Sequence, residues 1–185
     1  MLYSELQCSD AIHKAVERMG FAEMTEIQEK TIPVMMAGYD VIAKAPTGTG
    51  KTFAFGIPVA EHILPENKYP QAVIMAPTRE LAQQIAQELE ELTYFMPEVQ
   101  VACVYGGANM EKQAKRLAEG CQIVVATPGR LMDHYKHHSI DISHVTQIVL
   151  DEADEMLNMG FYKDVRHIIE MMKARKSLSM FSATI

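Results

Sequence analysis

A glycine-rich turn between two apolar runs constrains most strongly what this chain can fold into. The turn spans residues 45–52 and reads APTGTGKT; it follows the largely apolar run 40–43 and leads into the run 53–57. Glycines allow a tight turn whose N–H groups point inward, and a helix start adds unpaired donors and the positive end of a dipole. The pattern therefore predicts a phosphate-binding loop between a buried strand and a helix.

Two residues of this turn have distinct predicted roles. Lys51 supplies a point charge for the outer phosphates, and the hydroxyl of Thr52 can sit on a magnesium ion. The generic phosphate-loop pattern has glycine where Ala45 stands, and the alternative is an ordinary glycine-rich turn from strand to helix. We favour the phosphate loop because Gly-Lys-Thr closes the turn, and we expect the loop to face solvent.

Composition places the chain among ordinary globular domains. Its 185 residues are 48% hydrophobic, enough for one domain with a sizeable core. The three cysteines lack Cys-x-x-Cys spacing, which argues against a disulfide framework or structural zinc and fits a reducing cytosol. No apolar run approaches membrane-spanning length. The net charge of −7 argues against nucleic acid as a partner, so any such binding needs a local basic or backbone-donor surface.

Residues 1–40 are predicted to be helical. Ser9 can cap a first helix that Gly20 ends, and Thr25 can start a second helix that Pro33 and Gly38 interrupt.

From residue 41 onward, strand-length apolar runs alternate with helical patterns. Runs that are apolar throughout and alternate with helices imply a parallel sheet covered on both faces. Sites in such sheets gather at the carboxyl ends of the strands. The predicted strands are 41–45, 72–76, 100–105, 122–126, 147–150 and 178–181, and the predicted helices are about 51–63, 79–95, 109–118, 128–137 and 161–174.

The fifth apolar run ends in the acidic sequence 151–154, DEAD. An acidic residue at the end of a buried strand, downstream of a phosphate loop, is where an NTPase holds magnesium. Asp151 would bind the ion through its water shell, and Glu152 could orient and deprotonate the attacking water. Three carboxylates in four residues are more often a solvated helix start. We favour the functional interpretation because the acidic run is paired with the loop at 45–52.

Three other strand ends are small, polar or cationic where a helix begins. They are PTRELA (77–82), GG (106–107) and TPGR (127–130). Helix amides, threonine hydroxyls and arginine contact phosphates without reading bases. Plain helix capping explains any one of them alone. Their occurrence at successive strand ends predicts a track for a phosphodiester backbone.

Together these motifs resemble those of the N-terminal RecA-like domain of a DEAD-box RNA helicase, and the resemblance covers essentially the whole chain. The matching motifs, in order, are GFAEMTEIQ (20–28), APTGTGKT (45–52), PTRELA (77–82), GG (106–107), TPGR (127–130), DEAD (151–154) and SAT (182–184), with Tyr3 as the aromatic 17 residues before Gly20. The sequence departs from the family at Met24, where proline is usual, and at Tyr3, where phenylalanine is usual.

The resemblance implies a RecA-like α/β domain over 1–185 that binds ATP and Mg²⁺, with 1–40 as its adenine-recognition segment. Gln28 would read the adenine edge, Phe21 would stack on its face and Thr25 would support the loop. Ser182 and Thr184 would hydrogen-bond around Asp154 and couple hydrolysis to domain closure. The implied phosphate-binding residues are Thr47, Gly48, Thr49, Gly50, Lys51 and Thr52.

The resemblance also implies single-stranded or short duplex RNA, bound through its backbone, as a partner. The implied RNA-binding residues are Pro77, Thr78, Arg79, Gly106, Gly107, Thr127, Pro128, Gly129 and Arg130. In this family a second RecA-like domain follows the SAT motif and carries an arginine needed for hydrolysis, so we expect this chain alone to hydrolyse ATP very slowly. The alternatives are a phosphate-loop NTPase of another class, such as a DNA translocase, and a non-catalytic nucleotide- and RNA-binding module.

Two further clusters have plainer explanations. Three histidines, His134, His137 and His138, stand at metal-ligand spacing, but without an evident cysteine or carboxylate partner we expect a solvated helix end. The acidic residues Glu88, Glu90 and Glu91 are expected to form a solvated helix face.

Overall fold

Six strands form one sheet in the computed structural model, which describes residues 1–46, 48 and 50–184. All five strand pairings are parallel, in the order β1-β6-β5-β2-β4-β3. The strands span Ile42–Lys44 (β1), Ala72–Met75 (β2), Val101–Val104 (β3), Ile123–Ala126 (β4), Gln147–Asp151 (β5) and Ser177–Ser182 (β6). The sequence prediction of a parallel sheet is therefore confirmed, with each strand end placed within about one residue of its predicted position.

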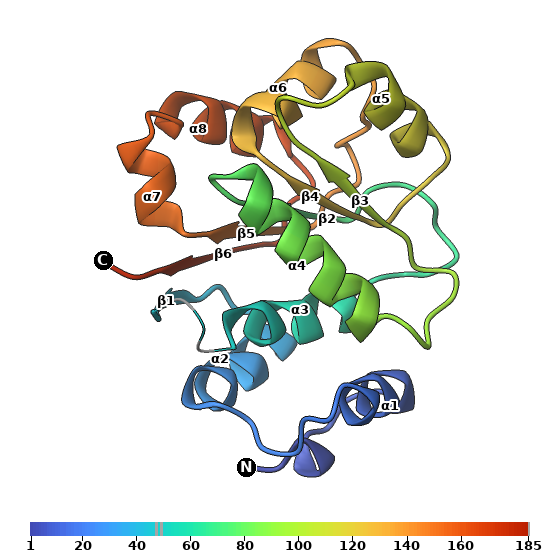
Figure 1. Cartoon of the computed structure of the whole chain (residues 1–185), viewed down its shortest axis with the longest axis vertical. Coiled ribbons are helices and arrows are strands. Elements are labelled where there is room, and N and C mark those ends of the chain that lie inside the picture. Colours follow the sequence, from blue (N-terminus) through green and yellow to red (C-terminus); the bar gives the residue numbers. More distant parts are fainter. Residues whose placement is uncertain (47, 49, 185) are drawn as a thin grey trace.

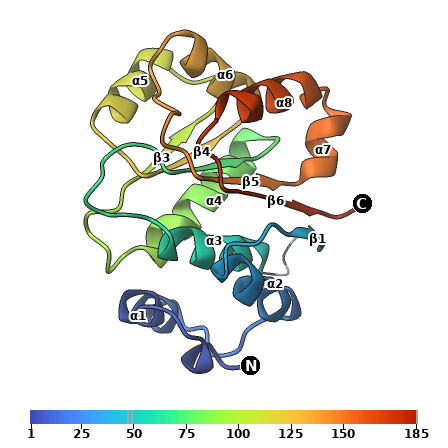
Figure 2. The same cartoon turned by 180° about the vertical axis from the view of Figure 1, so that it is seen from behind.

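Helices cover both faces of this sheet (Figures 1 and 2). On one face α3 and α4 lie next to the sheet and α1 and α2 pack outside them, and the last four helices lie on the other face; each set shares one buried cluster. The helices span Asp10–Arg18 (α1), Glu26–Met36 (α2), Lys51–Glu61 (α3), Arg79–Leu92 (α4), Met110–Ala118 (α5), Pro128–Lys136 (α6), Ala153–Asn158 (α7) and Tyr162–Met171 (α8), and a 3-10 helix, η1, spans Tyr3–Glu5. Within the described residues, no helix is long and apolar enough to cross a membrane.

The N-terminal helices begin where their caps predict. The Ser9 hydroxyl accepts a hydrogen bond from the Ile12 amide, and Thr25 caps α2 in the same way through the Gln28 amide. The predicted break at Pro33 is wrong, because α2 runs through this proline. A proline inside a helix costs about 3 kcal/mol locally. The close packing of α2 on α3 outweighs that cost.

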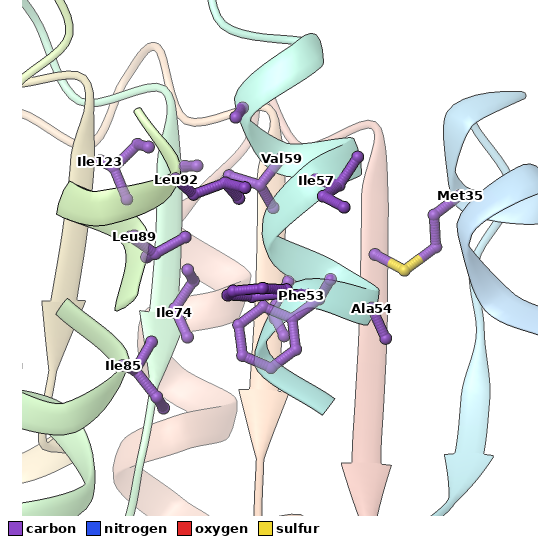
Figure 3. Close-up of a cluster of buried hydrophobic side chains, with 14 of the residues drawn as sticks. Met35, Phe53, Ala54, Ile57, Val59, Ile74, Ile85, Leu89, Leu92 and Ile123 are labelled. Carbon is purple, nitrogen blue, oxygen red and sulfur yellow. The ribbon is translucent and has the colours of Figure 1, made fainter. Parts of the chain in front are cut away.

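The strands are apolar throughout because both of their faces are buried. In β2, Ile74 belongs to the cluster under α1–α4, while Val73 belongs to the cluster under α5–α8. Successive strand residues point to opposite faces, so a strand between two helical layers needs apolar residues at every position. Figure 3 shows the first cluster, where side chains of α3 and α4 meet those of β2 and β4.

Replacing Leu89 with alanine tests this packing. Leu89 is fully buried between α4 and the sheet (Figure 3). Removing its branched end leaves a cavity, so Leu89→Ala should lower the free energy of unfolding by about 2–5 kcal/mol, measured by urea denaturation. The control is Gln87→Ala, an exposed position on the same helix, which should change that free energy by less than about 0.5 kcal/mol. Equal effects of the two substitutions would contradict the assignment of α4 to the core.

Candidate functional site

The predicted phosphate loop joins the carboxyl end of β1 to the first turn of α3. Gly48 and Gly50 have φ values of +83° and +82°, in the left-handed region that favours glycine. A Cβ atom on Gly50 would lie 2.5 Å from Nε2 of Gln28 and 3.0 Å from Oγ1 of Thr25. Glycine at this position therefore lets the loop touch the N-terminal segment. Two predicted phosphate-binding residues, Thr47 and Thr49, lie outside the described residues.

Lys51 is held by two carboxylates from the end of β5. Its Nζ lies 3.2 Å from Oδ1 of Asp151 and 2.5 Å from Oε1 of Glu152. Lys51 is only 6% exposed and Asp151 only 1%. The expectation that the loop faces solvent is therefore wrong for Lys51, and Asp151 at the strand end is buried with it. The three charged side chains bury one another, because β5 and the β1 loop open onto the same sheet edge.

Burial and pairing act against each other on the pKa values of these groups. Burial raises the pKa of Asp151 above its ordinary value, although the charge of Lys51 opposes that shift. Burial also acts to lower the pKa of Lys51, but the hydrogen bond to Glu152 and the charge of Asp151 outweigh it, and the pKa of Lys51 is raised. The lysine is thus fully cationic, and the strand end has carboxylate charge that a further cation could stabilise.

The backbone at Glu152 is strained. Its φ of 52° and ψ of 49° are left-handed, which few residues other than glycine adopt. Its amide donates a 2.9 Å hydrogen bond to Oδ1 of Asp151, the residue before it. This conformation ends β5, starts α7 and turns the Glu152 carboxylate toward Lys51. Strain of this kind occurs where a side chain must be held at a functional position.

The end of β6 is tied to the same acidic turn. The amide of Asp154 donates to Oγ of Ser182 at 3.3 Å. Both the amide and the hydroxyl of Thr184 donate to Oδ2 of Asp154, at 3.2 and 2.8 Å. The hydroxyl hydrogen bond lowers the pKa of Asp154 and keeps it ionised. Ser182 and Thr184 thus bond around Asp154 as expected, and their role in coupling stays a prediction.

The predicted adenine-reading residue is already hydrogen-bonded within the protein. Gln28 is 3% exposed, and its Oε1 accepts from the Tyr3 hydroxyl and, at 3.0 Å, from the Thr25 amide. Its Nε2 donates to the Gly50 carbonyl at 3.2 Å. These bonds use both lone pairs of the oxygen and one amide hydrogen. Gln28 therefore connects the N-terminal segment to the phosphate loop.

A cavity of about 310 Å³ connects these groups. Phe21, which is 51% exposed, lies edge-on to Phe53 at one side, and the acidic end of β5 lies at another. Glu88 of α4 also lines it, and its Oε2 is buried with no hydrogen-bond partner among the described residues. The expected solvated face is confirmed for Glu90 and Glu91, which are exposed, whereas Glu88 is only partly exposed and lines the cavity. A glycine loop, a buried lysine and adjacent carboxylates are the groups that suit a nucleotide phosphate with magnesium.

The three other predicted strand ends lie side by side, because β2, β4 and β3 are neighbours in the sheet. Thr78 accepts a hydrogen bond from the Leu81 amide at 3.2 Å and so caps α4. Thr127 instead accepts from the Gly106 amide at 3.4 Å, so its hydroxyl holds the glycine pair. The remaining predicted residues at this edge are Pro77, Gly107, Pro128 and Gly129, of which only Gly107 is exposed.

The two predicted RNA-contacting arginines differ in their environments. Arg79 is exposed, and its guanidinium lies 4.6 Å above the ring of Tyr105. The side chain of Arg130 is only 12% exposed, and its Nη1 donates to the Ala108 carbonyl at 3.0 Å. Arg130 therefore holds the loop after β3. Sequence reasoning missed Tyr105, although an aromatic residue directly before the glycine pair was a usable signal.

The predicted solvated helix end is wrong for His134, which is fully buried. Its ring nitrogens contact Oγ of Ser139 at 2.7 Å and Oε1 of Gln113 at 3.1 Å. Burial, followed by the charge of Arg130, lowers the pKa of His134 and keeps it neutral. In residues 1–46, 48 and 50–184, no three His, Cys, Asp or Glu side chains gather as a metal site.

Comparison with known proteins identifies the family. The DEAD/DEAH box helicase model matches residues 25–185. The chain belongs to this family. A DEAD box protein from the hyperthermophile Methanococcus jannaschii superposes on the whole chain with a TM-score of 0.90 and 41% identity, and the match covers 50% of that structure. This agreement confirms the expected RecA-like fold.

Two curated relatives carry the name ATP-dependent RNA helicase CshA. The protein from Limosilactobacillus reuteri is 49% identical over 185 residues, which is all of this chain and 37% of the relative. The protein from Listeria monocytogenes is 48% identical over 183 residues, 99% of this chain and 35% of the relative. The chain therefore spans little more than a third of the length of these DEAD-box relatives.

Removing the Lys51 ammonium should destabilise the domain in a pH-dependent way. Lys51→Ala leaves the buried Asp151 without its nearest cation, so it should lower the free energy of unfolding at pH 7 by about 1–3 kcal/mol. Burial raises the pKa of Asp151, so the folded variant takes up a proton more readily than the unfolded chain. The loss relative to wild type should therefore shrink as the pH falls toward about 5, in urea titrations at both pH values.

The double variant Lys51→Ala with Asp151→Asn is the control. It removes the buried charge along with the lysine, so it should recover part of the stability at pH 7. Lys51→Ala could instead lower the free energy of unfolding equally at both pH values, and equally with Asp or Asn at position 151. That result would mean that the ion pair is not the source of the effect.

Proposed function

We propose that this chain is the ATP-binding half of an ATP-dependent RNA helicase. The main support for the proposal is that the predicted nucleotide motifs and the predicted RNA motifs lie on separate halves of one edge of the sheet. The ends of β1, β6 and β5 hold the phosphate loop, the SAT motif and the acidic turn, and the neighbouring ends of β2, β4 and β3 hold the predicted RNA track. The family membership and the names of the CshA relatives support the same reaction.

Mg·ATP is the proposed ligand of the first half of the edge. Backbone amides of the loop and the Lys51 ammonium would hold the phosphates, which requires Lys51 to leave the carboxylates it now contacts. Thr52 and Asp151 would hold the magnesium ion, Asp151 through water. Bound magnesium neutralises charge on the phosphoryl oxygens. Phe21 and Gln28 would contact the adenine beside the loop. The Thr25 hydroxyl, which accepts a hydrogen bond from the backbone N–H of Gln28, would support that position.

Glu152 and Asp154 would act in hydrolysis. Glu152, fixed by its left-handed backbone, would orient the attacking water and accept its proton. Asp154, bonded to Ser182 and Thr184, would transmit the state of the acidic turn to β6 and to the chain beyond it. A change at the phosphate would thereby reach the residues that follow the sheet.

RNA is the proposed ligand of the second half of the edge, bound through its sugar-phosphate backbone. The net charge of −7 makes the whole chain a poor polyanion binder. Exposed Arg79, the exposed glycine pair 106–107 and the helix starts at Thr78 and Thr127 form a local surface of donors instead. Arg130 contributes by holding the loop after β3.

The full-length protein is proposed to contain a second RecA-like domain that closes over both ligands. The relatives are longer than this chain, and phosphoryl transfer needs charge neutralisation that an arginine finger often supplies. The free cysteines Cys8, Cys103 and Cys121 support a reducing, cytoplasmic location.

The nucleotide base should be selected through Gln28. A carboxamide can match the donor and acceptor of adenine, whereas guanine presents the opposite pattern. Gln28 would make this pair by exchanging one of the two bonds that its oxygen now accepts. Calorimetry should therefore show ATP and ADP binding more tightly than GTP and GDP, by about 1–3 kcal/mol. Gln28→Ala should abolish the difference and also weaken ATP, because Gln28 holds the Gly50 carbonyl. Equal affinity of the wild-type chain for ATP and GTP would contradict this prediction.

Steady-state ATP hydrolysis tests the proposal that turnover needs a second domain. This 185-residue chain should bind Mg·ATP and hydrolyse it slowly, with little stimulation by single-stranded RNA. The full-length protein should hydrolyse it faster by a factor on the order of 10³–10⁵, the contribution of an arginine finger. Glu152→Gln should abolish the full-length activity while leaving ATP binding intact. Robust RNA-stimulated turnover by the chain alone, lost in Glu152→Gln, would refute the need for a second domain.

A further inference from the structure

A buried polar cluster lies behind the predicted RNA track, between α5, α6 and the loop after β3. Its members are Gln113, Arg130, His134 and Ser139, and both Gln113 and His134 belong to the buried core. Polar groups at such positions cost free energy unless they are hydrogen-bonded. The sequence analysis singled out Arg130 and His134 for other reasons and did not point to Gln113 or Ser139, so the cluster is a feature of the fold.

Gln113 is the centre of this cluster, and chemistry fixes its orientation. Its Nε2 donates to the Tyr105 carbonyl at 3.0 Å, and a carbonyl can only accept. Its Oε1 accepts from Nη1 of Arg130 at 3.1 Å, and a guanidinium can only donate. Nε2 of His134, 3.1 Å from the same oxygen, must therefore be the protonated ring nitrogen. The neutral state of His134 agrees with that assignment.

These contacts fix the backbone of the loop at residues 105–108 from three sides. Gln113 holds the Tyr105 carbonyl, Arg130 holds the Ala108 carbonyl at 3.0 Å, and Thr127 holds the Gly106 amide at 3.4 Å. Gly107 lies between the held groups, exposed and with a φ of +81°. The loop therefore presents its glycines to solvent in one defined orientation.

The same contacts also orient Arg79. Tyr105, whose carbonyl Gln113 holds, places its ring 4.6 Å beneath the Arg79 guanidinium. Its hydroxyl accepts a hydrogen bond from Nε2 of Gln83 at 3.1 Å. A continuous set of contacts thus runs from His134 through Gln113 and Tyr105 to an exposed cation.

We propose that Gln113 is a positioning residue for RNA binding, which fixes the glycine loop and, through Tyr105, the Arg79 guanidinium. This inference rests on the proposed function of the edge. Gln113 is buried and does not itself contact RNA. Glutamine suits the position because it offers one donor and a shared acceptor. Glutamate would set a carboxylate against the Tyr105 carbonyl. Methionine would leave that carbonyl and Nε2 of His134 without their Gln113 partner and would remove one of the acceptors of Arg130.

The test uses the full-length protein and measures affinity for poly-U at several salt concentrations. Gln113→Met should weaken RNA binding by roughly tenfold and lower the salt slope by about one, as expected when one phosphate-binding cation is misplaced. Affinity for Mg·ADP should be unchanged, because the nucleotide site lies at the other half of the edge. Gln113→Glu should behave similarly and serves as the second variant where the methionine variant does not fold.

Gln122→Met is the matched control. Gln122 is also buried and lies at the opposite edge of the sheet. Its side chain donates to the Pro65 and Glu98 carbonyls and accepts from the Gln100 amide. Its replacement should lower the melting temperature without changing RNA affinity. Combining Arg79→Ala with Gln113→Met should weaken RNA binding by less than the two single effects together, because both changes remove the phosphate contact of Arg79.

The outcomes separate the inference from the proposed function. Equal weakening of RNA and Mg·ADP by Gln113→Met, or RNA affinity that follows melting temperature across all variants, would show a merely structural role. Unchanged RNA affinity in Gln113→Met while Arg79→Ala weakens binding would overturn the inference and leave the RNA track intact. Absence of salt-dependent RNA binding by the wild-type protein would overturn both.

Discussion

The contact of Lys51 with Asp151 and Glu152 is the interaction on which the nucleotide half of the structure depends. It joins the loop after β1 to the end of β5, two strands that lie on either side of β6. A buried lysine needs partners, and these carboxylates are the ones that the parallel sheet supplies at this edge. The site therefore has a satisfied arrangement of charges before any phosphate arrives. In the proposed function, phosphate and magnesium would replace those partners, so no buried charge would be left without an opposite charge.

Sheet order places the two proposed ligands on separate halves of one edge. The chain visits β1, β2, β3, β4, β5 and β6 in turn, yet their spatial order separates β1-β6-β5 from β2-β4-β3. The predicted RNA motifs lie between the first and last nucleotide motifs in the sequence, yet the two sets occupy separate halves of the sheet edge. The boundary falls between β5 and β2, so Glu152 lies one strand away from the helix start that carries Arg79. In the proposed function, a small displacement of the acidic turn after β5 would therefore change the position of the neighbouring end of β2.

The sequence could predict the features that depend on local rules and on burial. Strands such as β2 were identifiable because every residue is apolar, and Ser9 and Thr25 because a hydroxyl caps the helix that follows. The environments of Arg130 and His134 could not be predicted, because their partners Ala108 and Gln113 are set by how α5 packs beside α6. A motif identifies an arginine, but only the fold shows which atoms surround it.

Gln28 resembles Lys51 in that it is a buried polar side chain with partners inside the protein. Both side chains are buried, both are predicted to contact the nucleotide, and both are already bonded to protein atoms. Net hydrogen-bond energies are small because one partner replaces another, whereas an unpaired buried group costs about 1–3 kcal/mol. A site that keeps Gln28 and Lys51 bonded in its unliganded arrangement avoids that cost when nucleotide leaves. Part of the gross binding energy is then offset by the bonds that must break. With nucleotide bound as proposed, such a site would favour exchange of nucleotide over tight retention, as the proposed catalytic cycle requires.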